Sequence, residues 1–263
     1  MTDERYDDVL GHLDPRERAR LGALTAAFDP GTKRRLDALG IGPDWSCLEV
    51  GAGTGSIAHW IADRVPRGRV VATDLDLTLV RQPLPANLTL LRHDITHEGF
   101  PPGSFHLIHA RTVLMHLPDR ERVVERMLEW LAPGGVLSVE ELVHFPRHGM
   151  PDSNPFRRAV DAWWTMLSES FGMDDAWGTR VAGVMQRVGY EDVEVDADLP
   201  ALRAGTAIAE FSGLTLEVIE DRLVRGGFLA AGDVRAAREE IAEPGHLSFP
   251  MAVIATRGRR PTD

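Results

Sequence analysis

The stretch from residue 47 to residue 55 reads Cys-Leu-Glu-Val-Gly-Ala-Gly-Thr-Gly, and it decides the fold. Its first four residues form a mainly apolar run of strand length, and glycines then stand at every second position. Residues 56–65 follow with a helical pattern that Pro66 and Gly68 end. A strand, a glycine turn and a helix in this order let the backbone approach a ligand beside the partial positive charge of a helix N-terminus. The alternative is that the glycines only permit tight packing of the strand against the helix.

The rest of the chain continues the alternation of strands and helices. Residues 3–39 have the periodicity of two or three short helices, broken near residues 29–31. Further strands are expected over 70–74, 88–94, 105–110, 136–141, 191–197 and 248–256, the last with Pro250 at an edge or a bulge. Further helices are expected over 78–82, 119–131, 155–171, 179–188, 206–229 and 232–242, with Asp119 as an N-cap and a tight turn at 133–135. This pattern indicates an α/β fold around a parallel sheet.

Two acidic residues stand where strands are expected to end. Asp74 closes the strand after the glycine loop, and Asp94 closes the next one. A carboxylate at the first position can accept hydrogen bonds from a ribose diol, and one at the second can accept from an exocyclic adenine amine. Either acid alone would read as a solvated strand end, but both in register with the loop favour a ligand site. The loop is not a phosphate loop, because no Gly-Lys-Ser/Thr follows, and Ser56 departs from the dinucleotide fingerprint.

These motifs together resemble the class I methyltransferases that depend on S-adenosylmethionine. Among them, the small-molecule methyltransferases of bacterial secondary metabolism and quinone biosynthesis look most similar. The resemblance covers about residues 45–142 and rests on the whole set, since no single motif is specific. It is carried by Glu49–Gly55, Asp74, His93–Ile95, Phe105–Arg111, Leu114–Asp119 and Leu131–Leu137. It implies a Rossmann-like sheet of seven strands in the order 3-2-1-4-5-7-6, with the last strand antiparallel.

The resemblance also implies where S-adenosylmethionine would bind. The glycine loop would pass under the methionine part of the cofactor, Asp74 would hold the ribose, and Glu49 would steady the loop or the amino group. Residues after the third and fourth strands would contact the adenine edge and flank the methionine. The implied cofactor-binding residues are Glu49, Gly51, Ala52, Gly53, Gly55, Asp74, Leu75, Asp94, Ile95, Ala110 and Arg111.

Departures from the family pattern bear on the substrate. The fourth strand ends without the Asn/Asp-Pro-Pro-aromatic box that grips planar amino groups, which disfavours DNA, RNA and protein as acceptors. Residues 199–247 stand where a hairpin is usual, and with 145–175 they are expected to cap the strand ends and wall an acceptor pocket. A dimer surface is the alternative. We expect a single domain with N-terminal helices over 1–44, a cofactor-binding core over 45–144 and the remaining sheet with its cap over 145–263.

Catalytic candidates follow from the chemistry of methyl transfer, which needs alignment, exclusion of water and often a base. His144, just past the fifth strand, is expected to act as a base or to bind the acceptor, or else is a solvated loop residue. His116 is a weaker candidate that packing or capping would also explain. Arg111 is a candidate to bind an acidic acceptor, unless Glu140 or Glu141 pairs with it.

The remaining candidates concern stacking and metal binding. Trp163 and Trp164 are candidates to stack on the acceptor, with core packing as the alternative. His109 is interpreted as a packed strand residue. No metal is expected, because Pro146 breaks any helix that would align His144 with His148.

Composition limits the partners. The 263 residues carry 29 Lys and Arg against 40 Asp and Glu, a formal charge of −11, which argues against binding nucleic acid or an anionic membrane. The one cysteine, Cys47, forms no intrachain disulfide, which fits a reducing compartment. The first residues lack a signal-peptide pattern, and no stretch approaches the ~20 apolar residues of a membrane helix. We therefore expect a cytoplasmic protein, with a homodimer as one option.

The predicted function is transfer of a methyl group from S-adenosylmethionine to a small organic acceptor, with oxygen as the first expectation and carbon or nitrogen next. One alternative keeps the cofactor but catalyses a non-methylating reaction such as a cyclisation. A dehydrogenase is disfavoured by Ser56 and by the Pro-Gly-Gly sequence at 133–135. A noncatalytic adaptor is disfavoured by the intact glycines and acids.

Overall fold

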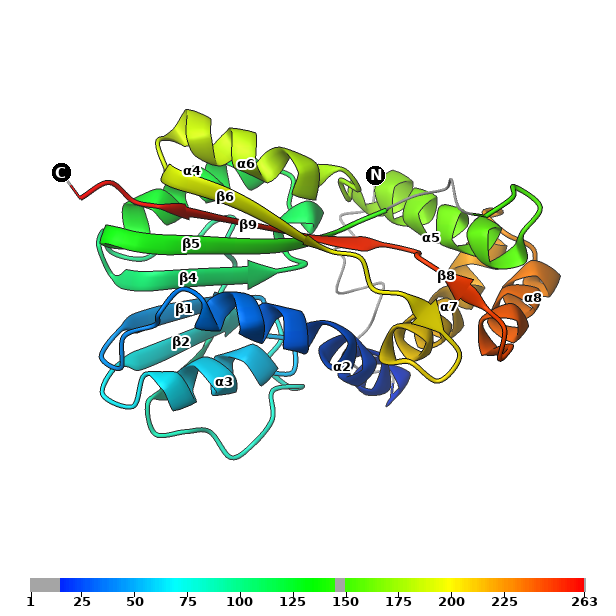
Figure 1. Ribbon diagram of the computed structural model, residues 1–263, viewed down its shortest axis with the longest axis horizontal. Helices are drawn as coiled ribbons and strands as arrows, with labels where there is room; N and C mark the ends of the chain where they lie inside the picture. The colour runs from blue at the N-terminus through cyan, green and yellow to red at the C-terminus, as the bar shows by residue number, and fades with distance from the viewer. Residues whose placement is uncertain (1–14, 145–149, 263) are drawn as a thin grey trace. The chain divides into compact units, whose positions relative to one another are not determined.

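A computed structural model describes residues 15–144 and 150–262 of the chain (Figure 1). These residues form two compact units. The sheet unit holds residues 29–142, 176–197 and 253–262, and the helical unit holds 15–28, 143–144, 150–175 and 198–252. The expected division into 1–44, 45–144 and 145–263 stays a prediction.

The sheet unit is built on seven strands in the order β3-β2-β1-β4-β5-β9-β6. The strands are β1 (Ser46–Val50), β2 (Arg69–Asp74), β3 (Leu88–Arg92), β4 (Phe105–Arg111), β5 (Leu131–Val143), β6 (Glu191–Asp198) and β9 (Ala252–Arg259). The pairs β1–β2, β1–β4, β2–β3 and β4–β5 are parallel, and β9 runs antiparallel to its neighbours (Figure 1). The expected Rossmann-like sheet is confirmed, and β9 takes the position expected for strand 7, between β5 and β6.

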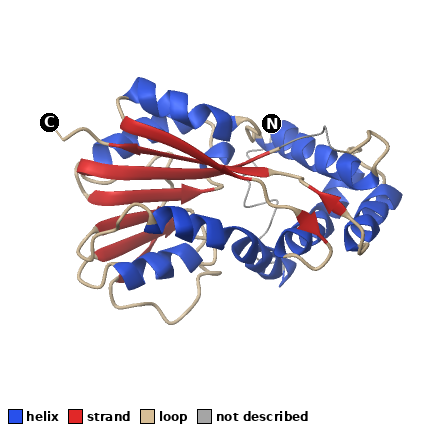
Figure 2. Cartoon of the chain, viewed as in Figure 1, coloured by secondary structure: helices blue, strands red, loops and turns tan. Residues whose placement is uncertain are grey.

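Helices cover this sheet and connect its strands (Figure 2). They are α2 (Pro15–Asp37, whose first half belongs to the helical unit), α3 (Ser56–Arg64), the 3₁₀ helix η1 (Leu114–His116), α4 (Arg120–Trp130) and α6 (Trp177–Val188). Helix α3 packs on β1, β2 and β3, and α4 packs against α6 and η1. The parallel strands thus carry their crossover helices as an α/β fold requires.

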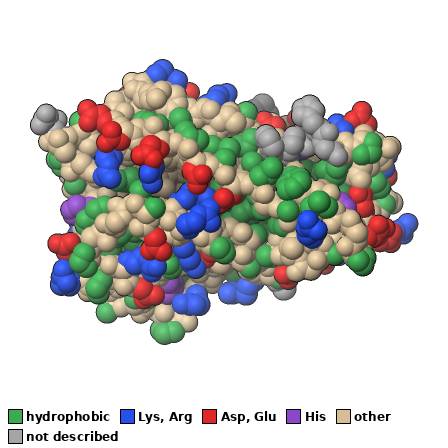
Figure 3. Space-filling model, in the orientation of Figure 1, with side chains coloured by type: hydrophobic (Ala, Val, Ile, Leu, Met, Phe, Trp, Pro, Cys, Tyr) green, Lys and Arg blue, Asp and Glu red, His purple; other side chains and the backbone are tan. Residues whose placement is uncertain are grey.

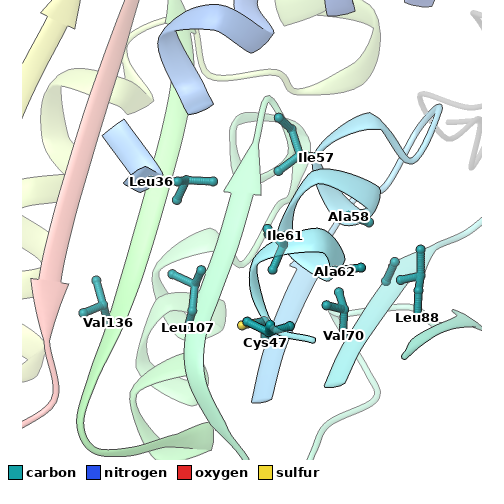
Figure 4. Packing of buried hydrophobic residues seen from close by; sticks show 12 residues of the cluster. Leu36, Cys47, Ile57, Ala58, Ile61, Ala62, Val70, Leu88, Leu107 and Val136 are labelled. Carbon is teal, nitrogen blue, oxygen red and sulfur yellow. The ribbon is translucent and has the colours of Figure 1, made fainter. Parts of the chain in front are cut away.

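An apolar cluster fixes α3 and the end of α2 to the sheet (Figure 4). Leu36 from α2 and Ile61 from α3 contribute to it together with Val70 and Leu107 from β2 and β4. Each such side chain, fully buried, contributes roughly 1.5–3 kcal/mol to folding. Cys47 lies in the same cluster, and burial raises the pKa of its thiol to about 12. The glycine loop therefore starts from a well-packed strand.

The helical unit contains α5 (Pro155–Phe171), α7 (Ala207–Arg225) and α8 (Ala231–Ala242), with the antiparallel pair β7 (Leu202–Arg203) and β8 (Leu247–Ser248). Each of the three helices packs against the other two. Asn154 caps α5, since its side-chain oxygen accepts a hydrogen bond of 2.8 Å from the amide of Arg157. Thr206 caps α7 in the same way through the amide of Ala209.

Several local predictions are wrong. Helix α2 continues through Pro30, where a break was expected, because hydrogen bonds from Arg111 on β4 and Ser56 on α3 hold the neighbouring Asp29. The predicted strand over 248–256 is two strands, β8 and β9, with Pro250 in the gap between them. Residues 78–82 form turns rather than a helix. The side chain of Asp119 makes no capping hydrogen bond to α4.

The expected turn at 133–135 lies within β5 instead of before it. Phe105 pairs with Leu131 and Leu107 pairs with Val136, so the register shifts across Pro133, Gly134 and Gly135. A local bulge therefore takes the place of the expected turn.

Charge and apolar surface are mixed on the molecule. On the face in Figure 3, acidic and basic side chains are interspersed among apolar ones. Within the described ranges, no helix is both long and apolar enough to span a bilayer.

Candidate functional site

The glycine loop between β1 and α3 has the backbone conformation that only glycine adopts easily. Gly51, Gly53 and Gly55 have φ angles of 70°, 52° and 76°. A Cβ at Gly51 would also stand 2.2 Å from a methyl carbon of Val113, and one at Gly55 would stand 2.7 Å from Val80. A Cβ at Gly53 would meet no atom within 4 Å, so the middle of the loop is where the backbone faces open space. Packing therefore constrains the outer two glycines, whereas the middle one lies beside open space.

Asp74, at the end of β2, is bonded to this loop. One carboxylate oxygen accepts a hydrogen bond of 2.8 Å from the amide of Gly53, and the other accepts one of 2.8 Å from the amide of Leu75. The second oxygen also accepts a longer hydrogen bond of 3.4 Å from the amide of Asp76. The predicted loop and the predicted acid thus form one unit, and Leu75 follows directly on it.

Asp94 lies two residues beyond the end of β3 rather than at it. One of its carboxylate oxygens accepts hydrogen bonds from the amide and the hydroxyl of Thr96, at 3.0 and 2.5 Å. Ile95 beside it is buried, and its carbonyl accepts a hydrogen bond from Arg126. This turn is therefore fixed in shape at the edge where β2 presents Asp74.

Arg111 closes β4, after the buried Ala110. Its ion pair is with Asp29 rather than with Glu140 or Glu141, the two partners considered from the sequence. Its guanidinium donates hydrogen bonds of 2.9 Å to Asp29 and to the hydroxyl of Thr32, both on α2. Asp29 also accepts a hydrogen bond of 3.2 Å from Ser56, the first residue of α3. Asp29 therefore bonds both to Arg111 at the end of β4 and to Ser56, which directly follows the glycine loop.

His109, Glu49 and Glu140 form a buried row across β4, β1 and β5. Nδ1 of His109 lies 2.7 Å from a carboxylate oxygen of Glu49, its partner in the strand register. Nε2 of His109 lies 3.9 Å from Glu140. Glu140 in turn accepts hydrogen bonds from Arg35 at 2.8 and 3.0 Å and from Thr32 at 2.6 Å.

The ionisation of this row follows from burial and from its partners. Burial raises the pKa of Glu49, while His109 opposes the shift. Glu49 and Glu140 together overcome burial at His109 and raise its pKa to about 9. Hydrogen bonds and charges from His109 and Arg35 hold the pKa of Glu140 well below its usual range. The carboxylates on either side of His109 therefore favour its imidazolium form.

Glu141, the next residue of β5, behaves in the opposite way. One of its oxygens accepts hydrogen bonds from the amides of Leu114 and Met115, at 2.9 and 3.3 Å. Among the described residues, its other oxygen, which is also buried, has no hydrogen-bond partner. Burial raises the pKa of Glu141 to about 8. The two hydrogen bonds that Glu141 accepts from backbone amides fix the loop after β4, and Val113 of this loop packs against Gly51.

His116 ends η1, between the buried Met115 and the start of α4. The loop that leads to it begins at Thr112, whose φ of 55° is rare for a residue with a branched side chain. The amide of Thr112 donates 2.8 Å to the carbonyl of Glu140. Such strain persists where surrounding bonds determine the backbone, and it often marks a functional loop.

His144, Trp163 and Trp164 belong to the helical unit. His144 is largely buried, its Nε2 lies 3.2 Å from Asp161, and its ring stacks on Trp164 with centroids 5.3 Å apart. The alternative, a solvated loop residue, is therefore wrong, while a role as base or acceptor-binding group stays a prediction. Trp163 contacts Trp164 and Phe211, so both tryptophans are part of an aromatic cluster. The sequence analysis did not name Asp161, because only the folded structure brings it next to His144. His148 lies outside the described residues.

The sequence also missed Asp29, Thr32 and Arg35. Their spacing of three places them along one face of α2, next to the apolar Phe28 and Leu36. The sequence did contain a signal for them. Three polar residues recur at helical spacing on a helix face whose other residues are apolar and pack inward. In the parts of the chain that are described, no three His, Cys, Asp or Glu side chains come together as a metal site.

Comparison with known proteins supports the reading of the sheet unit. Residues 48–137, about a third of the chain, match the family model described as a methyltransferase domain. Methyltransferase str3 of Strobilurus tenacellus is 31% identical over 153 residues, which cover 58% of this chain and 55% of the relative. Phosphoethanolamine N-methyltransferase 3 of Arabidopsis thaliana is 27% identical over 154 residues, 56% of this chain and 29% of the relative. The chain thus spans about half the length of the first relative and less than a third of the second.

Solved structures share the fold. A geranyl diphosphate methyltransferase in complex with SAM aligns with a TM-score of 0.56 at 15% identity, over 97% of this chain and 95% of the other. The [4+2]-cyclase SpnF aligns with a TM-score of 0.55 at 18% identity, over 85% and 77%. Residues 48–137 are therefore similar to a methyltransferase domain in sequence, and the chain is similar to methyltransferases in fold.

Proposed function

We propose that the chain binds S-adenosylmethionine in the sheet unit and transfers its methyl group to a small organic acceptor. The observation that carries the proposal is the hydrogen bond between Asp74 and the amide of Gly53, which joins the strand-end acid to the glycine loop. Asp74 would accept from the ribose hydroxyls, Leu75 and Ile95 would pack on the adenine, and Asp94 would contact its edge. The loop from Gly51 to Gly55, with Ala52, would support the methionine part.

The residues around the loop would complete the cofactor site. Glu49 would face the amino group, and Ala110 would flank the methionine. Arg111 is already paired with Asp29, so its first role would be to hold α2 against the loop. His116 would act through the loop that starts at Thr112. The cofactor supplies the electrophilic methyl group, and the protein aligns the acceptor with it and excludes water.

Titration calorimetry tests the cofactor assignment. Wild-type protein should bind S-adenosylmethionine or S-adenosylhomocysteine with micromolar affinity, about −8 kcal/mol. Asp74→Asn should weaken binding at least tenfold, because a ribose loses a charged acceptor. Asp76→Asn is the matched control, since it makes the same change two residues along the chain, in an acid whose carboxylate accepts from the amide of Thr78. Absence of binding by the wild type, or a preference for NAD, would contradict the proposal.

His144 is proposed as the base or acceptor-binding group, with Trp163 and Trp164 as apolar contacts of the acceptor. Asp161 would orient the imidazole, as carboxylates do for catalytic histidines. With an acceptor that turns over, His144→Gln should lower kcat by about 10²–10⁴ while cofactor affinity is unchanged. His246→Gln is the control, because His246 is equally paired with a carboxylate, that of Glu240, in the same unit. Equal kcat for the two variants would remove His144 from the mechanism.

An oxygen acceptor is the first expectation, and carbon or nitrogen follows. The second candidate function, a cyclisation that uses bound S-adenosylmethionine without consuming it, is favoured by the fold shared with the [4+2]-cyclase. The two are separated by measuring S-adenosylhomocysteine. Its formation in step with product indicates methyl transfer, and product without it indicates the alternative. We place this reaction in the cytoplasm on the grounds of the single cysteine and the acidic charge.

A further inference from the structure

His109 stands at the centre of the buried row beneath the glycine loop, and its side chain is fully buried. Two carboxylates face it, those of Glu49 on β1 and Glu140 on β5, and Arg35 on α2 pairs with Glu140. Arg111, two residues along β4, acts on Glu49 from further away. No other strand position in the described sheet places an imidazole between two buried carboxylates.

The two carboxylates do not share their counter-charges equally. Glu140 receives two hydrogen bonds from Arg35 and one from Thr32, so it is well compensated without His109. Among the described residues, Glu49 has a single close side-chain partner, the Nδ1 of His109 at 2.7 Å. A buried carboxylate without a cation takes up a proton rather than remain charged. The charge on Glu49 therefore depends on His109.

We propose that His109 is a positioning residue that keeps Glu49 ionised and fixed beneath the glycine loop, so that Glu49 balances the cationic amino group of the cofactor. The inference rests on the proposed function, because it assigns Glu49 to that group. Glu49 directly precedes Val50 and Gly51, so a carboxylate fixed by His109 also fixes the start of the loop. The hydroxyl of Thr73 on β2 donates to the carbonyl of Glu49, which holds the backbone as well.

His109→Asn is the informative variant, because asparagine keeps a donor near the position of Nδ1 but removes the charge. The pKa of Glu49, already raised by burial, then rises further. Glu49 becomes neutral as the pH falls, and cofactor affinity falls with it. His106→Asn is the matched control: His106 lies three residues earlier on β4, is exposed, and accepts from the amide of Ser46.

The measurement is calorimetric binding of S-adenosylhomocysteine between pH 6 and pH 8.5. The ratio of dissociation constants, His109→Asn over wild type, should rise as the pH falls and approach tenfold per pH unit. The ratio cancels the titration of the ligand's own amino group. His106→Asn should give a ratio near one at every pH. In a Glu49→Gln background, His109→Asn should no longer change the affinity, because no carboxylate remains to be kept ionised.

Each outcome separates the two claims. Wild-type protein that does not bind overturns the proposed function. Wild-type binding with a His109→Asn ratio that is flat with pH overturns the role of His109. If His109→Asn does not fold, the wild type carries the test through the imidazole ¹⁵N shifts of His109. A ring that is charged at pH 7 and shifts on ligand binding supports the proposal, and a ring that is neutral at pH 7 overturns it.

Discussion

Ionisable side chains at the ends of the central strands reach low-energy states in two different ways. Glu49, His109 and Glu140 are buried together and compensate one another, which avoids the several kcal/mol that each lone buried charge would cost. Glu141 is equally buried, but only one of its oxygens is bonded among the described residues. It therefore takes up a proton, which is why its pKa is raised to about 8.

Glu141 makes stability depend on pH with a defined sign. Its folded-state pKa of about 8 lies above the ordinary value of 4.5, so the folded state binds the proton more tightly than the unfolded state. This stabilising contribution is complete below about pH 4.5 and is lost as the pH rises through about 8. Relative to Glu141→Gln, which imitates the neutral acid, the wild type should lose up to about 5 kcal/mol across that range.

Urea denaturation at pH 5, 7 and 9 measures the difference between the two proteins. The midpoint of the wild type should fall relative to that of Glu141→Gln as the pH rises. Glu125→Gln is the control, since Glu125 is an exposed acid on α4 and should give the wild-type pH dependence. If the difference between the urea midpoints of the wild type and Glu141→Gln were the same at all three pH values, Glu141 would be ionised in the folded protein.

At the scale of the element, α2 shows how one helix face can serve a site on a sheet. Asp29, Thr32 and Arg35 reach Arg111 and Glu140 from one side of the helix. Leu36, on the same part of α2, packs into the apolar cluster of the sheet unit. This combined anchoring explains why Pro30 is tolerated inside the helix, although proline removes one backbone hydrogen bond.

Asp29→Ala tests this anchoring. The change leaves the guanidinium of Arg111 buried without its carboxylate, and the expected loss of stability is about 3 kcal/mol. Cofactor affinity should fall too, because Ser56 at the start of α3 loses its acceptor. Thermal or urea unfolding together with calorimetry checks both effects.

Asp37→Ala provides the comparison within the same helix. Asp37 pairs with Arg64, and both side chains are exposed to solvent. Surface ion pairs contribute little to stability, so this variant should behave like the wild type. If Asp29→Ala were no more harmful than Asp37→Ala, the ion pair at Arg111 would not hold the helix.

At the scale of the whole molecule, the predictions from sequence succeed where hydrophobic pattern and turn chemistry coincide. The parallel strands, α3 and α5 follow from apolar runs broken by glycine, proline and acidic residues, and the sheet order follows from the resemblance to the class I methyltransferases. They fail where a long-range contact outweighs a local signal, as at Pro30 in α2. They also fail near Pro250, where the gap between β8 and β9 divides what reads as one strand.

The residues proposed to bind the cofactor could be named from the sequence because they lie close together in local motifs. The glycine loop needs φ angles that glycine alone adopts easily, and Gly51, Gly53 and Gly55 make this requirement visible in the sequence. The partners of those residues are distant in sequence: Asp29 is 82 residues from Arg111, and Glu49 is 60 from His109. Such contacts depend on strand register and helix placement, which a single sequence does not reveal.

The sequence by itself therefore determined the α/β class, the strand order implied by its motifs, and the loop and acids proposed to hold the cofactor. The class and the loop depend on local backbone preference and on hydrophobic period, which neighbouring residues specify, whereas the strand order is what the resemblance to a known family implies. The tertiary structure alone decided that Arg111 pairs with Asp29, that His109 lies between two carboxylates, and that Glu141 is buried beside the loop after β4. The physical reason is that the energy of a buried charge depends on what surrounds it in space, and those neighbours come from α2, β1 and β5 together.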